Sequence, residues 1–202
     1  MEITIFPTKG NLIATRRSYT LANMGYDLMD KKRSILVREL MGLLDKAKNI
    51  QKSINENFST AYVALQSANI TLGVIREISL AMPEETGLSI RFRSVMGVEI
   101  PMVSLEEMKI TVPYGLFSSN SLLDEAYISF VKVKYLCAVL AEMENSIYRL
   151  AYAIKKTQKR ANALKNIIIP HYEDVLKYIA DVLEERDREE FSRLKVIKKK
   201  KA

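Results

Sequence analysis

Residues 36–72 read LVRELMGLLDKAKNIQKSINENFSTAYVALQSANITL, and an apolar side chain recurs in this stretch every three or four residues. The recurring residues are Leu36, Leu40, Leu43, Ala47, Ile50, Ile54, Phe58, Ala61, Leu65, Ala68 and Leu72. This heptad spacing extends well past the few heptads that indicate a coiled coil. Toward the N-terminus, the same apolar stripe extends back to Leu12. No proline lies between Pro7 and Pro83 to break a helix. The pattern predicts one long helix over residues 8–80, with Thr8 as its N-cap.

A second apolar stripe with the same spacing predicts a second long helix over residues 121–195. Its members from residue 140 onward are Leu140, Met143, Ile147, Leu150, Ile154, Thr157, Ala161, Leu164, Ile168, His171, Val175, Tyr178 and Val182. Ser121, with Asp124 three residues later, resembles a capping box at the start. Pro170 removes one helical hydrogen bond and predicts a bend there. That bend is either tolerated near the helix end or is a curvature on which function depends.

The segment between the two stripes, residues 81–120, has a different pattern. Proline and glycine punctuate it, and apolar Ile90 and Phe92 alternate with Arg91 and Arg93. Met96 and Gly97 can form a turn into a second strand, which predicts a short β-hairpin. Because an isolated hairpin is marginally stable in water, we expect this one to rest on the helices or on a partner.

Two helices of matched length around a short insert predict an all-α fold, a long antiparallel two-helix coiled coil with a short β-hairpin in the connection. Pairing the two apolar stripes removes both from water. We expect one domain over residues 1–202, ending in a basic tail at 196–202, and facing residues whose numbers add up to about 200. Ile50 would then face Leu150, and Leu36 would face Leu164. The expected seam of the coiled coil includes Leu36, Leu40, Leu43, Ile50, Leu140, Ile147, Leu150, Ile154 and Leu164.

Composition argues against enzyme chemistry. With 7 glycines, and neither glycine-rich phosphate-binding motif among them, the chain has no obvious nucleotide-binding loop. One histidine and one cysteine cannot build a transition-metal cluster, so we expect no cofactor, no metal and no catalytic residue. Cys137 is expected to pack as a small core side chain, and His171 to pack in the seam. The run of acidic residues from Glu184 to Glu190 is interleaved with arginines and is interpreted as a solvated, salt-bridged helix face.

The net charge of +7 leaves several kinds of partner open. Basic residues gather at Lys155, Lys156, Lys159 and Arg160 and again in the tail, where they could meet RNA, an anionic membrane or acidic protein loops. Acidic residues along both helices, and the lack of clustered aromatic and basic residues, disfavour a nucleic-acid-binding arm. No secretory signal and no membrane-length apolar run is visible, so we expect a soluble, cytoplasmic protein without direct membrane insertion.

Two blocks of the sequence resemble the D subunit of the V-type and A-type rotary ATPases. The first contains Pro7-Thr8-Lys9, Leu12 and residues 22–33, ANMGYDLMDKKR. The second contains residues 156–164, KTQKRANAL, then Ile169-Pro170, then residues 183–195, LEERDREEFSRLK. Departures from the family pattern are Met29-Asp30 for the usual Leu-Lys and Gln158 where arginine is common.

The resemblance implies a non-catalytic shaft of the central stalk that transmits torque between the A/B catalytic hexamer and the membrane rotor. It would thereby couple ATP hydrolysis or synthesis to proton or sodium transport. Its implied partners are the F subunit of the central stalk, the A and B subunits and the C/d socket above the rotor ring, and the complex would hold it at the cytoplasmic side of the membrane. The four basic residues from Lys155 to Arg160 would then face the hexamer. The alternatives that periodicity leaves open are a coiled-coil scaffold and a nucleic-acid-binding coiled-coil arm.

Overall fold

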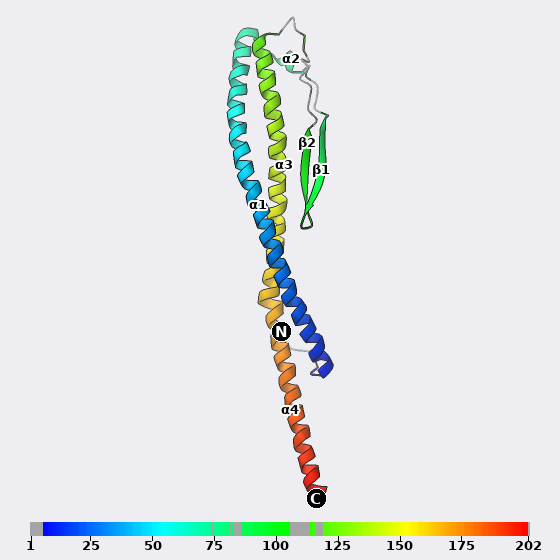
Figure 1. Cartoon of the computed structure of the whole chain (residues 1–202). Coiled ribbons are helices and arrows are strands. Elements are labelled where there is room, and N and C mark those ends of the chain that lie inside the picture. Colours follow the sequence, from blue (N-terminus) through cyan, green and yellow to red (C-terminus); the bar gives the residue numbers. More distant parts are fainter. Residues whose placement is uncertain are drawn as a thin grey trace. The chain divides into compact units, whose positions relative to one another are not determined.

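The computed structural model describes residues 6–73, 75–80, 82, 86–105, 114–115 and 119–201 (Figure 1). Their elements are, in chain order, α1 (Lys9–Leu72), α2 (Arg76–Leu80), β1 (Leu88–Val95), β2 (Val98–Leu105), α3 (Ser121–Ala163), the π-turn η2 (Leu164–Ile168) and α4 (Ile169–Lys201). A long helix pair with a two-stranded hairpin between its members confirms the predicted fold class. The chain divides into two compact units. We call them the terminal unit, which runs up to Ser34 and from Ile154 onward, and the hairpin unit, Ile35–Ala153.

Helix α1 begins as predicted and ends earlier than predicted. The Thr8 hydroxyl oxygen accepts a hydrogen bond from the backbone N–H of Asn11 at 3.2 Å, which confirms the N-cap. The helix stops at Leu72 rather than at residue 80, since Gly73 adopts a left-handed φ of 75° that side chains rarely tolerate. The short helix α2 follows as a separate element.

In the hairpin unit, α1 and α3 run antiparallel and pack against each other. Tyr62 of α1 contacts Phe130 of α3 edge to face, with ring centroids 5.7 Å apart. Nearer the connection, Ala68 and Leu123 are buried in one cluster with Tyr114. The fully or nearly fully buried residues of this helix pair are Leu36, Ile54, Ala61, Ala68, Leu123, Ala126, Val133, Ser146 and Leu150.

In the terminal unit, the start of α1 packs against the end of α3, η2 and α4. The Tyr19 hydroxyl donates to the Glu173 carboxylate at 2.7 Å, and the Lys165 ammonium lies 5.8 Å above the Tyr26 ring centroid. Leu164 lies against Gly25, 3.9 Å from where a Cβ atom would be. The buried residues here are Thr15, Ala22, Thr157, Ala161, Val175 and Ile179.

The register of the helix pair differs from the prediction. Within each unit the numbers of facing residues add up to about 190, for Tyr19 with Glu173 and for Tyr62 with Phe130 alike. The expected sum of about 200, with Ile50 facing Leu150, is therefore wrong. The reason is that α1 ends eight residues before residue 80, whereas α3 begins at Ser121 as predicted.

The π-turn η2 interrupts the α-helical hydrogen bonding between α3 and α4. The Ile169 N–H donates to the Leu164 carbonyl five residues earlier, so this turn holds an additional residue. Ile168 and Tyr178, predicted in the seam, are exposed, whereas Val175, also predicted there, and Ile179 are fully buried. The turn lies directly before Pro170, whose ring would meet the Asn166 carbonyl in a regular α-turn.

The hairpin forms as predicted, with Met96 and Gly97 as its two turn residues. Both have positive φ, 51° and 75°, as a two-residue hairpin turn of the type common between twisted strands requires. The strands are antiparallel and in register from Val95 opposite Val98 to Leu88 opposite Leu105.

The hairpin rests on α3 through the outer edge of β2. The Glu142 carboxylate accepts a hydrogen bond from the Val103 N–H at 2.7 Å, and the Arg149 guanidinium donates to the Glu99 carbonyl at 3.1 Å. Arg149 also lies 5.5 Å from the centroid of the Phe92 ring. Glu142 and Arg149 lie seven residues apart, two helical turns, so a single face of α3 bonds to Glu99 and Val103, which lie four residues apart on the strand.

Tyr114 connects the hairpin unit's core to the first turn of α3. Its hydroxyl donates to the Asp124 carboxylate at 2.5 Å, and its ring packs edge to face with Tyr127. Burial of the phenol, followed by the hydrogen bond to Asp124, raises the pKa of Tyr114 well above its ordinary value of 10.0.

This raised pKa predicts a loss of stability at alkaline pH. The folded chain holds the phenolic proton more tightly than the unfolded chain, so the stabilisation is complete below the unfolded pKa and is lost as pH rises above it. We expect the free energy of unfolding to fall more steeply between pH values of about 9 and about 11 in the wild type than in Tyr114→Phe. Urea titrations of both proteins at each pH measure this difference. Parallel pH profiles would contradict it.

Candidate functional site: basic and apolar surfaces of the terminal unit

The four predicted basic residues form one exposed surface on α3. Lys155, Lys156, Lys159 and Arg160 are all exposed. At about 100° per residue, they occupy the side of the helix opposite the buried Thr157 and Ala161. None of the four forms an ion pair with another side chain that the structure describes. Their charges are therefore available to a partner.

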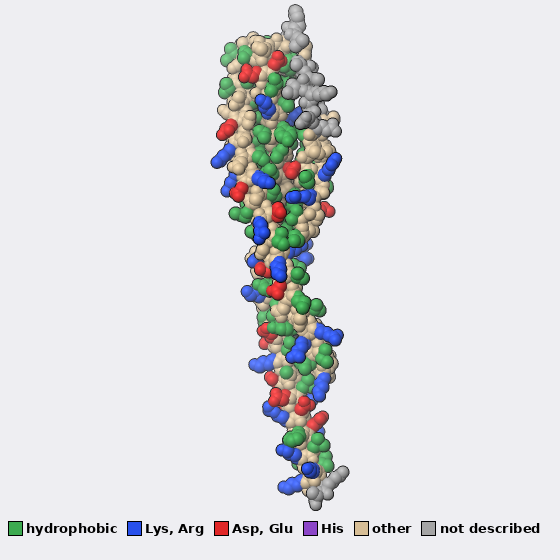
Figure 2. Space-filling view, in the orientation of Figure 1, with side chains coloured by type: hydrophobic (Ala, Val, Ile, Leu, Met, Phe, Trp, Pro, Cys, Tyr) green, Lys and Arg blue, Asp and Glu red, His purple; other side chains and the backbone are tan. Residues whose placement is uncertain are grey.

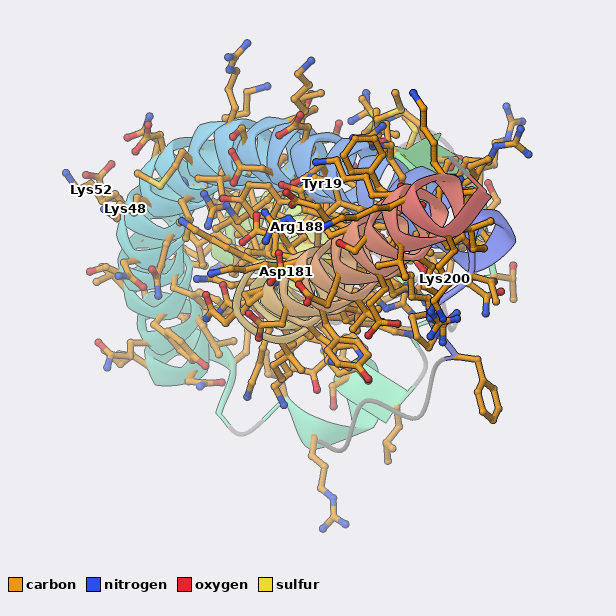
Figure 3. All side chains as sticks on the ribbon, turned by 90° about the horizontal axis from the view of Figure 1, so that it is seen from below. Tyr19, Lys48, Lys52, Asp181, Arg188 and Lys200 are labelled. Atoms are coloured by element: carbon orange, nitrogen blue, oxygen red, sulfur yellow. The ribbon has the colours of Figure 1, made fainter. Side chains whose placement is uncertain are left out.

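Three other arginines of the terminal unit are paired within their own helices. Arg33 lies 2.7 Å from Asp30, Arg188 lies 2.6 Å from Glu184, and Arg193 lies 3.4 Å from Glu189. The last two pairs confirm the interpretation of the acidic run as a solvated, salt-bridged face. Asp181, Arg188 and Lys200 lie along α4 in Figure 3, which also shows Lys48 and Lys52 projecting outward from α1 in the hairpin unit.

Helix α1 carries an exposed apolar stripe that sequence reasoning missed. It consists of Ile13, Leu21, Met24 and Leu28, all more than half exposed. These residues lie opposite the buried side marked by Thr15 and Ala22, and Arg16, Arg17 and Thr20 line the same surface. Four large apolar side chains in water on one helix face indicate a surface that another protein covers. Their spacing of eight, three and four residues was visible in the sequence, as a second stripe offset from the seam.

The end of α4 carries a second such surface. Residues 184–200 are all exposed, and among them Phe191, Leu194 and Ile197 recur every three residues, each more than half exposed. Apolar side chains remain visible between the charged ones toward this end of the helix in Figure 2. The residues after 195 were predicted as a tail, yet α4 continues to Lys201.

The predicted seam residues all lie on covered faces of their helices. Leu36 and Leu150 are fully buried, at 0% exposure. Leu40, Leu43, Ile50, Leu140, Ile147, Ile154 and Leu164 are half-buried. Cys137, in contrast, is exposed rather than packed in the core, because it lies beside the seam and not within it.

A comparison with protein-family models shows which family has this sequence of paired helices and exposed stripes. The family model for the ATP synthase D subunit matches residues 11–199. The chain belongs to the ATP synthase D-subunit family. The match spans both units, so the basic surface and both apolar stripes are parts of a D subunit, and the resemblance that the sequence suggested is confirmed.

The relatives match nearly the whole chain. The V-type ATP synthase D subunit of Thermotoga neapolitana is 46% identical over 202 residues, covering 99% of this chain and 100% of the relative. The A-type ATP synthase D subunit of Thermococcus kodakarensis is 37% identical, covering 97% of this chain and 94% of the relative. That of Methanobrevibacter smithii is also 37% identical, covering 96% and 86%. In the described part of the chain, no helix is both long enough and apolar enough to cross a bilayer.

Proposed function

We propose that this chain is the central-stalk shaft of a V/A-type ATPase and transmits torque between the A/B catalytic hexamer and the membrane rotor. Its membership of the ATP synthase D-subunit family is the observation that carries this proposal. In this role the chain couples ATP hydrolysis or synthesis to proton or sodium transport and contributes no catalytic group of its own. Residues 1–202 work as a single shaft domain.

The physics of the helix pair supports a mechanical role. Helix α1 is 64 residues long without interruption, far beyond the three turns of an average helix. Twisting one of two packed helices disturbs the interlocking of side chains at every level of the seam, so a coiled coil resists torsion along its length. The seam residues named above supply that interlocking.

The partners of the shaft follow from the same proposal. The A and B subunits surround the terminal unit and meet its basic surface and its two apolar stripes. The F subunit and the C/d socket bind elsewhere on the chain, and the complex holds the shaft at the cytoplasmic face of the membrane. An exposed basic surface together with exposed apolar stripes suits a protein ring whose lining is apolar with an acidic rim.

Reconstitution tests the rotor role directly. The chain is mixed with purified F subunit and A/B hexamer, and single-molecule observation records a bead attached to Cys137 during ATP hydrolysis. We expect ATP-dependent unidirectional rotation of the bead and a stable complex of all four components. Stable assembly without rotation, or no assembly at all, would contradict the proposal.

Reversing the charge of the basic surface is expected to weaken coupling. The triple variant Lys156→Glu, Lys159→Glu and Arg160→Glu places three anions against an acidic rim, and we expect the affinity for the hexamer to fall roughly tenfold. Ion transport per ATP hydrolysed, measured in proteoliposomes, should fall with it. The charge-conserving variant Lys156→Arg, Lys159→Arg and Arg160→Lys is the matched control and should behave as wild type. Unchanged coupling in the reversed variant would mean that these residues only solvate the helix.

A further inference from the structure

The outer edge of β1 presents backbone hydrogen-bonding groups that nothing in the described part of the chain pairs. On β2, Glu99 and Val103 direct their backbone groups outward, since both bond to α3. Their partners in the register are Ser94 and Ile90. Residues opposite each other in an antiparallel pair direct their backbone groups either both inward or both outward. Ser94 and Ile90, and Phe92 between them, therefore direct theirs away from β2, on the side of the hairpin farther from α3 in Figure 1.

The side chains of β1 are also exposed. Leu88, Ile90 and Phe92 are 47%, 55% and 60% exposed and share one face of the hairpin, because side chains alternate along a strand. Arg91 and Arg93 occupy the other face and are also exposed. An eight-residue open edge with alternate apolar residues is a template on which a further strand can form.

We propose that β1 binds an extended segment of another protein as a third, antiparallel strand, and that this segment alternates apolar with acidic residues. The apolar residues of the segment would cover Leu88, Ile90 and Phe92, and its carboxylates would face Arg91 and Arg93. This proposal does not depend on the rotor role of the chain.

Charge selects this occupant over a second copy of the same hairpin. Two β1 strands can bring their apolar side chains together only in registers that also place their arginines on one shared face. The guanidinium groups of Arg91 and Arg93 would then face those of the other copy, and like charges in cross-strand pairs are destabilising. An acidic strand turns this repulsion into attraction.

A peptide of the stated pattern tests the proposal on the full chain. The probe is the acetylated and amidated peptide TVEVEVTT with a fluorescent label, and binding is followed by fluorescence anisotropy. The Ile90→Pro variant removes only an outward N–H, as proline on an edge strand permits, and should weaken binding about tenfold. Ile90→Thr is the matched control: it also loses the apolar side chain but keeps that N–H, so it should bind more tightly than Ile90→Pro.

A second experiment reverses the charges on β1 and compares an acidic with a basic peptide. The variant Arg91→Glu with Arg93→Glu should lose affinity for TVEVEVTT and gain affinity for TVKVKVTT, whereas the wild type should prefer the acidic peptide. Circular dichroism and the amide signal of Val103 confirm that each variant keeps its hairpin on α3. Three results would overturn the proposal. One is no saturable binding to the wild type, and another is equal binding by the proline and threonine variants. The third is a wild-type dimer that Ile90→Pro dissociates, which would identify a second copy as the occupant.

Discussion

Replacement of Ile179 by alanine is expected to lower the free energy of unfolding by about 2–5 kcal/mol, the range for large-to-small changes in a close-packed core. Ile179 is fully buried in the terminal unit, at 0% exposure. A helix pair has few layers of packing, so neighbouring side chains can close the resulting cavity only in part. Urea unfolding followed by circular dichroism measures the change.

Tyr178 is the matched control because it is the adjacent residue on the same helix. It is 41% exposed, and Tyr178→Ala should cost less than about 1 kcal/mol. A regular heptad pattern through this region predicts the reverse order, with Tyr178 in the seam and Ile179 outside it. A larger cost for Tyr178→Ala would therefore favour the regular heptad pattern and contradict the burial of Ile179.

The difference at these two residues shows what periodicity could and could not predict. Heptad spacing predicted both long helices, and turn chemistry predicted the hairpin at Met96 and Gly97, because these depend on residues close together in sequence. The π-turn depends on how Pro170 is accommodated within a packed helix. Proline alone predicted a bend there but not which hydrogen bonds would rearrange.

The prediction of which residues face each other in the helix pair was wrong for a similar reason. The long apolar stripe continues past Leu72 in sequence, so nothing in its spacing marked the end of α1. Gly73 was the only local sign, and a single glycine in a helical pattern is more often tolerated than not. The eight residues between Leu72 and residue 80 belong to the connection rather than to α1, and this shifted the facing residues within each unit.

Of the candidate site, the sequence predicted the basic surface but not the two apolar stripes. Lysines and arginines on a helix are exposed almost wherever they occur, so the surface from Lys155 to Arg160 could be predicted directly. The apolar stripes of Ile13 to Leu28 and Phe191 to Ile197 were missed, because apolar residues were assigned to the core by default. Whether an apolar stripe faces a helix of the same chain or another protein depends on where the partner helix ends. The Arg186 guanidinium still donates to the Pro7 carbonyl at the start of the chain, whereas residues 187–200 beyond it are exposed.

Deletion of one residue from η2 is expected to be costly only while Pro170 is present. Removing the exposed Asn166 returns this turn to α-helical spacing, and residues on both sides keep their faces because a π-turn amounts to a one-residue insertion. The Pro170 ring then meets the carbonyl four residues before it, at a cost of about 3 kcal/mol.

The double-mutant cycle separates this clash from any other effect of the deletion. In the Pro170→Ala background the same deletion should cost less than about 1 kcal/mol, because an alanine there completes the helical hydrogen bond. The coupling between the two changes should therefore be about 2–3 kcal/mol in urea unfolding of the four proteins. Equal costs of the deletion in both backgrounds would mean that η2 exists for a reason other than the proline, and the packing of Leu164 against Gly25 would then be the next contact to test.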